Sequence, residues 1–565
     1  MNRSSLILLS VIFLGAAFRF YGINWDNTCC LHPDERAIIM YTLPLTMPHN
    51  IAEFFSPQSP LNAHFFAYGN LPLYLLKLLS VIAQYINPSF ATYASINLIG
   101  RGISTLADLG TIIILYFIGK QVASKYVGYL ASFFYAISVF PIQNSHFYTV
   151  DILLTFFITA TLYVLLLFYR HPSKKNAVLI GVLMGLSLTT KISATTLFAA
   201  FTIALSLDFL IVFLKTPHRP HIWFLHLPVF IKRLLTEGVI VVGTTLGTFT
   251  IFQPYAIIDF HEFLEQNLQQ SQMTHNAYIF PYTLQYVEKI PYLYELKNIF
   301  LWGLGPALAT ISFAGTVYVF ATLIRSGKTG RNYQIFILFA FFTVYFLIVG
   351  NFAVGWMRYM LPVYPLFILF GAIFFNYLLQ HLRRSSNIIN ISTLGIFFCS
   401  TLLWTLSFMH IYAVPHTRIS ATQWILQNIP TGSTLAIEHW DDRLPLIDSE
   451  KYRFVEMTLY DQPDDERKWQ IINEKLQQAD YIILASDRLY LPLQKLSDCT
   501  KYKLCYPQTA LYYQKLFLGK LGFQKIAEFT SYPTIPILDI PLYDTSADEA
   551  FSVVDHPKVM IFKRR

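Results

Sequence analysis

Residues 150–169, VDILLTFFITATLYVLLLFY, contain a single charged group, Asp151, and form one long apolar run. A transmembrane helix takes about 20 predominantly apolar residues, so this run is long enough to span a bilayer. Ten similar runs occur along the chain: 5–23, 102–119, 126–142, 177–190, 192–214, 236–252, 302–324, 333–351, 360–380 and 387–411. The sequence therefore predicts a polytopic α-helical membrane protein with about eleven spans.

The composition agrees with a membrane protein. Hydrophobic residues make up 54% and charged residues 13% of the 565 residues, whereas charged residues are about a quarter of a soluble domain. The length allows a helical bundle and a separate folded domain. The formal net charge of +8 is modest. Because we find no basic tail and no aromatic-basic stripe, we expect no nucleic-acid partner.

Lysine and arginine gather in alternate loops between the predicted spans, and this asymmetry predicts the orientation. The loops expected inside contain Arg3, Lys120, Lys125, Arg170, Lys174, Lys175, the segment 215–233, Arg325, Lys328, Arg331, Arg383 and Arg384. We therefore expect a multi-pass protein of the cell membrane with a cytoplasmic N-terminus. A cleaved signal peptide is the alternative for the first span, although Arg19 and Phe20 do not suit a cleavage site after 15–17.

Three segments leave the membrane on the predicted outer side. Two are the external loops 24–100 and 253–300, which belong to a transmembrane domain over residues 1–412. The third, 413–565, is polar and alternates strand-like runs with helix-like runs: 434–437, 481–484 and 559–562 against 467–478 and 510–521. This alternation predicts an extracytoplasmic α/β domain.

Cysteines and acidic pairs give little sign of a metal. Cys499 and Cys505 in the outer domain can pair in an oxidising compartment, and Cys29-Cys30 has no evident function. The acidic pair Asp441-Asp442 is expected to be solvated at the surface. No metal-binding residues and no certain cofactor are therefore predicted, although a divalent metal is left open.

Six ionisable residues cluster at the outer ends of the predicted spans: Asp34, Glu35, Arg101, Asp151, Lys191 and Arg358. Each alone is equally well explained as an anchor whose charge reaches water. Charged groups at membrane depth are costly, and by default they indicate function. Together they predict a site at the lipid–water boundary, in which Arg101, Lys191 and Arg358 bind a lipid phosphate and a carboxylate accepts a proton from a hydroxyl.

Several motifs occur in an order and on a side that resemble one family. They are His-Pro-Asp-Glu-Arg-Ala at 32–37, Gly-x-x-x-Gly-Leu at 181–186 followed by Lys191, Gln-Pro-Tyr at 253–255, Pro-Tyr-Thr-Leu-Gln-Tyr at 281–286 and Arg-Tyr-x-x-Pro at 358–362. This pattern resembles the GT-C superfamily of membrane glycosyltransferases. Within it, the chain is similar to the branch of protein O-mannosyltransferases and lipid A aminoarabinose transferases (glycosyltransferase family 39). The resemblance covers roughly residues 1–412.

The resemblance implies an inverting glycosyltransferase. Its donor would be a polyprenyl-phosphate sugar, and its acceptor a hydroxyl of a protein, lipid or glycan at the outer membrane face. Asp34 would be the general base, with Glu35 beside it as a second catalytic residue. The remaining substrate contacts are assigned to His32, Arg36, Asp151, Tyr282 and Tyr359.

Two other classes of protein are weighed against the enzyme. A secondary transporter of a lipid-linked or small polar substrate also has many spans with charges inside the membrane. Its charges are expected near the midplane on broken helices, within an internal repeat, and neither feature is evident in the sequence. A non-catalytic scaffold that uses its outer domain for binding is the third reading.

Overall fold

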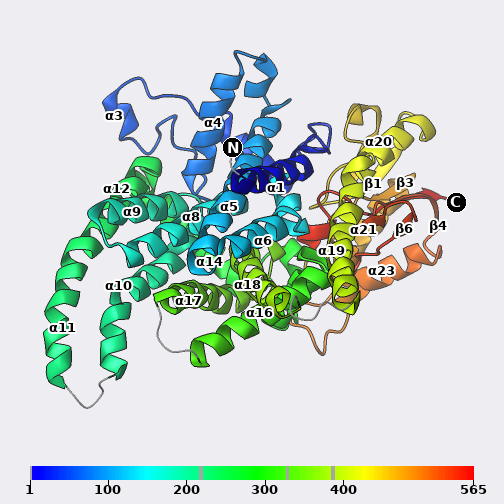
Figure 1. Ribbon diagram of the computed structural model, residues 1–565. Helices are drawn as coiled ribbons and strands as arrows, with labels where there is room; N and C mark the ends of the chain where they lie inside the picture. The colour runs from blue at the N-terminus through cyan, green and yellow to red at the C-terminus, as the bar shows by residue number, and fades with distance from the viewer. Residues whose placement is uncertain (1–2, 216–219, 326–329, 383–387) are drawn as a thin grey trace.

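The computed structural model describes residues 3–215, 220–325, 330–382 and 388–565. Its first part is entirely helical (Figure 1). The elements are α1 (Arg3–Phe20), α2 (Pro33–Thr42), α3 (Ile51–Phe54), α4 (Asn70–Ala83), η1 (Pro88–Ala91), α5 (Ile96–Val122), α6 (Lys125–Ala136), α7 (Val139–Ser145), α8 (Val150–Arg170), α9 (Lys174–Leu188), η2 (Ile192–Thr195), α10 (Thr196–Lys215), α11 (Pro220–Arg233), η3 (Leu234–Gly238), α12 (Val239–Phe252), α13 (Tyr255–Ile258), α14 (Phe260–His275), η4 (Pro281–Tyr286), α15 (Leu293–Asn298), η5 (Ile299–Gly303), α16 (Pro306–Arg325), α17 (Gly330–Gly350), η6 (Met357–Val363), α18 (Tyr364–Leu382), α19 (Ile388–Met409) and η7 (His410–Ala413).

Helices occupy all the predicted apolar runs, but their number does not fix the number of spans. Among the described residues, seven helices are long and apolar enough to cross a membrane. An eighth span results if α6 and α7, which meet at a bend of 59°, form one broken span. Other apolar helices, such as Ser5–Phe20, are shorter. The polytopic architecture is confirmed, whereas the predicted count of about eleven is not.

Glycines allow some of these helices to approach closely. Gly181 and Gly185 of α9 face α12, where added Cβ atoms would lie 1.8 Å from Thr244 Oγ1 and 2.6 Å from Thr248 Cβ. Small residues spaced by four are a common device for packing helices in membranes, because they let the two backbones touch. The Gly-x-x-x-Gly motif therefore joins α9 to α12 and leads the chain to Lys191.

The first helix is an integral part of this bundle. Arg19, near the end of α1, is fully buried and forms an ion pair with Asp108 of α5 at 2.6 Å. The same carboxylate accepts a hydrogen bond of 2.6 Å from the hydroxyl of Tyr135 in α6. A buried charge is stable only with such partners, so the three helices are fixed to one another at this point.

The remainder of the chain forms an α/β region. Its elements are α20 (Thr417–Asn428), β1 (Thr434–Glu438), η8 (Ser449–Lys451), β2 (Arg453–Met457), α21 (Glu466–Gln478), β3 (Tyr481–Leu484), α22 (Tyr490–Lys495), α23 (Pro507–Phe517), β4 (Phe523–Phe529), β5 (Thr534–Ile535), β6 (Ile540–Pro541), α24 (Glu549–Ser552) and β7 (Val559–Arg564). Five strands form a sheet in the order β2-β1-β3-β7-β4. The strands β2, β1 and β3 are parallel, and β7 is antiparallel to both β3 and β4.

Figure 1 shows these yellow-to-red elements on the side of the molecule opposite to α9–α12. The predicted strand-like and helix-like runs all lie within or overlap elements of the matching kind. The strands β2 and β4 were not predicted. They lie at the two edges of the sheet, and each contains exposed residues, so neither forms a continuous buried run.

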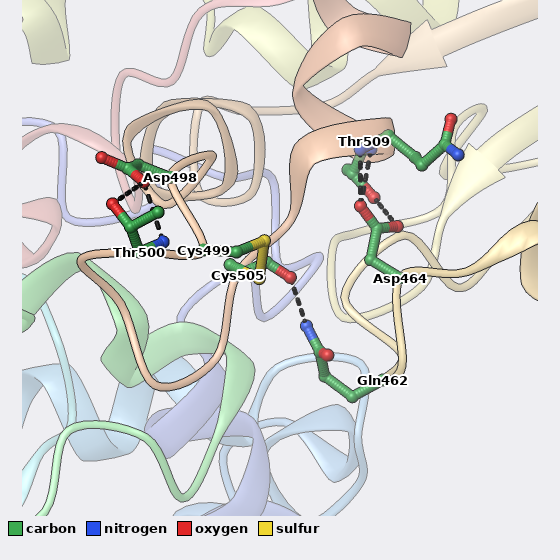
Figure 2. Close-up of a disulfide and its surroundings, with 8 residues drawn as sticks. Gln462, Asp464, Asp498, Cys499, Thr500, Cys505 and Thr509 are labelled. Atoms are coloured by element: carbon green, nitrogen blue, oxygen red, sulfur yellow. Dashed lines mark hydrogen bonds between the residues drawn. A yellow bond between two sulfur atoms is a disulfide. The ribbon is translucent and has the colours of Figure 1, made fainter.

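A disulfide joins Cys499 and Cys505, with their Cα atoms 5.0 Å apart. Figure 2 shows how the chain around it is fixed: Gln462 donates to the carbonyl of Cys505 at 2.8 Å, and Asp464 accepts hydrogen bonds from Thr509. The pairing left open by the sequence therefore forms in the structure. Disulfides persist in oxidising compartments. The charge pattern also predicts that this region lies outside the cytoplasm.

Labelling of introduced cysteines tests the predicted orientation. In a background with Cys29 and Cys399 replaced by serine, we expect an impermeant maleimide to label Glu450→Cys, an exposed position of the α/β region, on intact cells. The exposed position His171, between α8 and α9, should react as His171→Cys only after permeabilisation. Labelling of both cysteines on intact cells, or of His171→Cys alone, would contradict the orientation.

A buried histidine holds the carboxylate that attaches the α/β region to the bundle. His556 lies between two carboxylates, with 2.5 Å from Nδ1 to Asp555 and 2.6 Å from Nε2 to Asp544. Asp555 also accepts hydrogen bonds from Gln143 of α7 and, at 2.8 Å, from the hydroxyl of Tyr412. His556 thus holds Asp555, and Asp555 connects the end of the α/β region to the helical bundle.

This arrangement predicts a stability that depends on pH. Burial alone would lower the pKa of His556, but Asp544 and Asp555 outweigh burial and raise the pKa to about 10. The imidazolium therefore contributes stability that is fully present below the unfolded pKa of about 6.5 and is lost as the pH rises through about 10. We expect the Tm of the wild type to exceed that of His556→Gln at pH 6, and the difference to shrink towards pH 10. His171→Gln is the matched control, and a constant difference would contradict the assignment.

Candidate active site

The predicted cluster opens into a cavity of about 730 Å³ between the helical bundle and the α/β region. Of the residues predicted from the sequence, six line it: His32, Asp34, Lys191, Tyr282, Arg358 and Tyr359. Four different parts of the bundle supply them, namely the start of α2, the turn before η2 and the segments η4 and η6. Ligand sites are typically concave and mostly apolar with a few polar groups that converge, and this cavity fits that description.

The start of α2 positions Asp34. Pro33 occupies the first helical turn, where its fixed φ and missing N–H are tolerated. The ring Nδ1 of His32 accepts a hydrogen bond of 3.1 Å from the backbone N–H of Asp34 and so caps the helix. Burial lowers the pKa of His32 to about 3. The ring is therefore neutral, as its acceptor role requires.

Asp34 forms an ion pair with Arg358 at the cavity wall. The side chains are 22% and 13% exposed, so both reach the cavity. Burial acts to raise the pKa of Asp34, but the charge of Arg358 and other neighbours outweighs it and lowers the pKa below the ordinary value. Asp34 is thus held as a carboxylate beside the cation.

Asp151 joins this pair to Lys191. Its carboxylate lies 2.8 Å from the Nζ atom of Lys191 and 3.8 Å from the Nε atom of Arg358. The Nζ atom also lies 4.3 Å from the centre of the Tyr359 ring. Two cations therefore converge on one carboxylate, and the ionic groups form a chain that runs Lys191–Asp151–Arg358–Asp34.

Glu35 and Arg101 lie away from the cavity. Successive residues of a helix point about 100° apart, and Glu35 points inward to the guanidinium of Arg101 at 2.6 Å. Arg101 also bonds Asp26 at 2.8 Å, and Glu35 accepts the backbone N–H of Tyr148 at 2.9 Å. Neither residue lines the cavity, so the structure brings neither the catalytic role predicted for Glu35 nor the phosphate contact predicted for Arg101 to the proposed site. Both side chains are 0% exposed, and they fasten α2 to α5.

Arg36 and the acidic pair also differ from the prediction. Arg36 does not line the cavity, since it bonds Asp442 at 2.7 Å. Arg418 holds both carboxylates of the pair, at 2.9 Å from Asp441 and 2.8 Å from Asp442. The surface solvation predicted for the pair is therefore wrong, whereas the substrate contact predicted for Arg36 stays a prediction that the cavity lining does not support. These residues connect α2 to the α/β region.

The α/β region supplies a wall of the cavity that the sequence did not predict. It contributes Trp440, Arg488 and Glu549. Arg488 Nε lies 2.5 Å from Glu549. Burial raises the pKa of Glu549 to about 7, although Arg488 opposes the rise. These residues stand far from Asp34 in the sequence, and no local pattern marks them. The bundle adds Trp356 and Tyr68.

One group of side chains in the described part of the chain has the composition of a metal site. The ligand atoms of His64, Asp259 and Glu262 all lie within 4.8 Å of one another. None of the three lines the cavity, so the cluster does not place a cation beside Asp34.

A protein-family model matches part of the chain. Residues 97–234 match the family model described as dolichyl-phosphate-mannose-protein mannosyltransferase. The matched segment includes Asp151 and Lys191. The predicted resemblance to the GT-C superfamily is confirmed. No curated protein matches the sequence.

Several solved structures are similar to this chain at low sequence identity. The oligosaccharyltransferase of Archaeoglobus fulgidus in the apo form is 13% identical, with a TM-score of 0.50 over 100% of this chain and 88% of that chain. The same enzyme tethered to an acceptor peptide is 11% identical, with a TM-score of 0.50 over 99% and 88%. ArnT from Cupriavidus metallidurans bound to undecaprenyl phosphate is 12% identical, with a TM-score of 0.42 over 87% and 94%.

Proposed function

We propose that the protein is an inverting glycosyltransferase that moves a sugar from a polyprenyl phosphate to a hydroxyl acceptor at the outer face of the cell membrane. The observation that carries this proposal is the pairing of Asp34 with Arg358 in a cavity that Lys191 also lines. A carboxylate and two cations are the groups that such a transfer requires. The acceptor hydroxyl belongs to a protein, a lipid or a glycan.

The reaction proceeds in one displacement. The acceptor oxygen attacks the anomeric carbon while Asp34 takes its proton, and the bond from that carbon to the phosphate oxygen breaks. The leaving group is a phosphate that is already anionic. Arg358 and Lys191 stabilise it, so a strong general acid is not needed. Inverting hydrolases need a second carboxylate because their leaving group is poorer.

The ion pair links donor binding to the strength of the base. Arg358 lowers the pKa of Asp34. A donor phosphate competes for the same guanidinium, and each contact that it takes over weakens the hold of Arg358 on Asp34. Asp34 therefore becomes a better proton acceptor once the donor is bound. This order prevents the base from acting before the leaving group is in place.

The comparisons support the class of donor and acceptor. The description of the matching family model names a dolichyl-phosphate-mannose donor and a protein acceptor. The fold is also that of an oligosaccharyltransferase captured with an acceptor peptide. Lys191 and Asp151 fall inside the matched segment, whereas Asp34 and Arg358 fall outside it.

A test of activity separates this proposal from transport. Purified protein in proteoliposomes is given a polyprenyl-phosphate sugar with a labelled sugar, together with peptide, lipid and glycan acceptors. We expect label on one acceptor, and free polyprenyl phosphate in equal amount. Movement of the intact donor across the bilayer with no labelled product would overturn the enzyme in favour of a transporter.

A further inference from the structure

The carboxyl ends of two neighbouring strands lie at the α/β side of the cavity. β1 and β3 are parallel neighbours. Trp440 follows the end of β1, and Arg488 follows the end of β3. In open α/β sheets, ligands bind at the carboxyl ends of parallel strands. Both residues line the cavity that contains Asp34, so the binding edge of the sheet faces the proposed site of transfer.

Trp440 is held in an unfavourable conformation. Its φ is +72°, in the left-handed region that residues with a Cβ rarely adopt. The side chain is nevertheless 43% exposed, although a large aromatic residue gains free energy from burial. Strained backbone that the surroundings enforce tends to occur at functional sites. The strain here turns an indole ring towards the cavity.

A partly buried polar network holds this conformation. The carbonyl of Trp440 accepts a hydrogen bond of 3.4 Å from Nη1 of Arg488. The next residue, Asp441, accepts a hydrogen bond of 2.5 Å from the hydroxyl of Ser486 and pairs with Arg418 at 2.9 Å. Asp442 also pairs with Arg418. The acidic pair Asp441-Asp442 thus fixes the position of Trp440, the residue that precedes it.

The surroundings of the ring match the chemistry of a sugar. Tyr282 lies 5.7 Å from Trp440 and 6.2 Å from Trp356, centre to centre, so aromatic faces extend along one wall. One face of a sugar ring carries C–H groups with a slight positive charge, and an aromatic face is slightly negative. The hydroxyls at the rim need hydrogen-bonding partners, which Arg488 and Glu549 offer beside the indole.

We propose that Trp440 is the platform on which a sugar ring stacks, and that Asp441 and Asp442 are the residues that position it. This assignment rests on the proposed glycosyl transfer. The ring belongs either to the donor or to a glycan acceptor, since the chemistry of recognition is the same for both. The α/β region therefore completes the substrate site and does not merely cover it.

Binding measurements on matched variants test the platform. Trp440→Phe keeps an aromatic face, Trp440→Leu keeps apolar volume without one, and Trp424→Leu is a control tryptophan of α20 outside the cavity. For each protein in nanodiscs, the Kd of a polyprenyl-phosphate sugar is compared with that of polyprenyl phosphate alone. The preference for the sugar form is the ratio of these two Kd values. We expect Trp440→Leu to reduce this preference by about 3- to 10-fold, the usual weight of an aromatic contact. Trp440→Phe should retain most of it, and polyprenyl phosphate alone should bind all variants equally.

The outcomes are distinct. An unchanged donor preference with a 3- to 10-fold higher KM for a glycan acceptor in Trp440→Leu, again the weight of one aromatic contact, would assign the ring to the acceptor. No change in either quantity would overturn the platform while leaving the glycosyltransferase intact. A wild type that binds no polyprenyl phosphate would instead remove the proposed function and the platform with it.

A double-mutant cycle tests the positioning role. Asp442→Asn alone should reduce the preference for the sugar form. Added to Trp440→Leu, it should have no further effect, because both changes remove the same contact. Additive losses would show that Asp442 acts independently of Trp440.

Discussion

Asp34→Asn should lower the rate of sugar transfer by about 10²–10⁴-fold, the usual weight of general acid–base catalysis. The change keeps the size of the side chain and removes the proton acceptor. Transfer is measured with purified protein, a polyprenyl-phosphate sugar and an acceptor. The matched control is Glu53→Gln, a carboxylate of the same external loop that does not line the cavity.

Donor binding separates a lost base from a damaged fold. In the wild type Arg358 is paired with Asp34, and Asp34→Asn frees the guanidinium. We therefore expect Asp34→Asn to bind polyprenyl phosphate at least as tightly as the wild type while turnover falls. A loss of both binding and turnover would indicate misfolding, because a buried cation without its partner is destabilising. Near-normal turnover would remove Asp34 from the role of base.

Arg358→Lys should raise the KM for the donor by roughly 10- to 100-fold, although the charge is kept. A planar guanidinium can bond two phosphate oxygens at once, whereas an ammonium group acts as a point charge. Loss of one hydrogen bond to a charged group costs about 1.5–3 kcal/mol, which corresponds to that range. The KM for the acceptor should change little.

The exposed Arg325 at the end of α16 provides the matched control, since Arg325→Lys should leave the donor KM unchanged. The charges on the predicted inner face also include Arg383 and Arg384, which lie outside the described residues. An Arg358→Lys enzyme with a normal donor KM would show that Arg358 only ties η6 to α2.

The sequence predicted the helices well because each span needs its own apolar run. The predicted number of spans is not confirmed, because several of the apolar runs form helices that are too short to count by length and composition, such as Ser5–Phe20 and Ile192–Leu207. The predicted division into residues 1–412 and 413–565 stays a prediction, although the sheet itself begins at Thr434.

The site was predicted in part for equally physical reasons. Charges at the ends of apolar runs gave Asp34, Asp151, Lys191 and Arg358, and the structure brings these four together. Position in the sequence could not tell Asp34 from Glu35. Which of two neighbouring carboxylates faces a cavity depends on how α2 is rotated, and Arg101 fixes that rotation by drawing Glu35 inward.

The contribution of the α/β region could not be predicted at all. Trp440 and Arg488 line the same cavity because β1 and β3 are adjacent in the sheet. The sequence of a single strand does not show which strand lies beside it. The apparent metal-type pair Asp441-Asp442 was misread as surface because its partners, Arg418 and Arg36, come from two other elements of the fold.

The most direct test of the account is the structure of Asp34→Asn with a bound polyprenyl-phosphate sugar. The account predicts the phosphate within hydrogen-bonding distance of both Arg358 and Lys191, with the anomeric carbon facing residue 34. A phosphate bound elsewhere on the protein, with Arg358 and Lys191 both remote from it, would contradict the account.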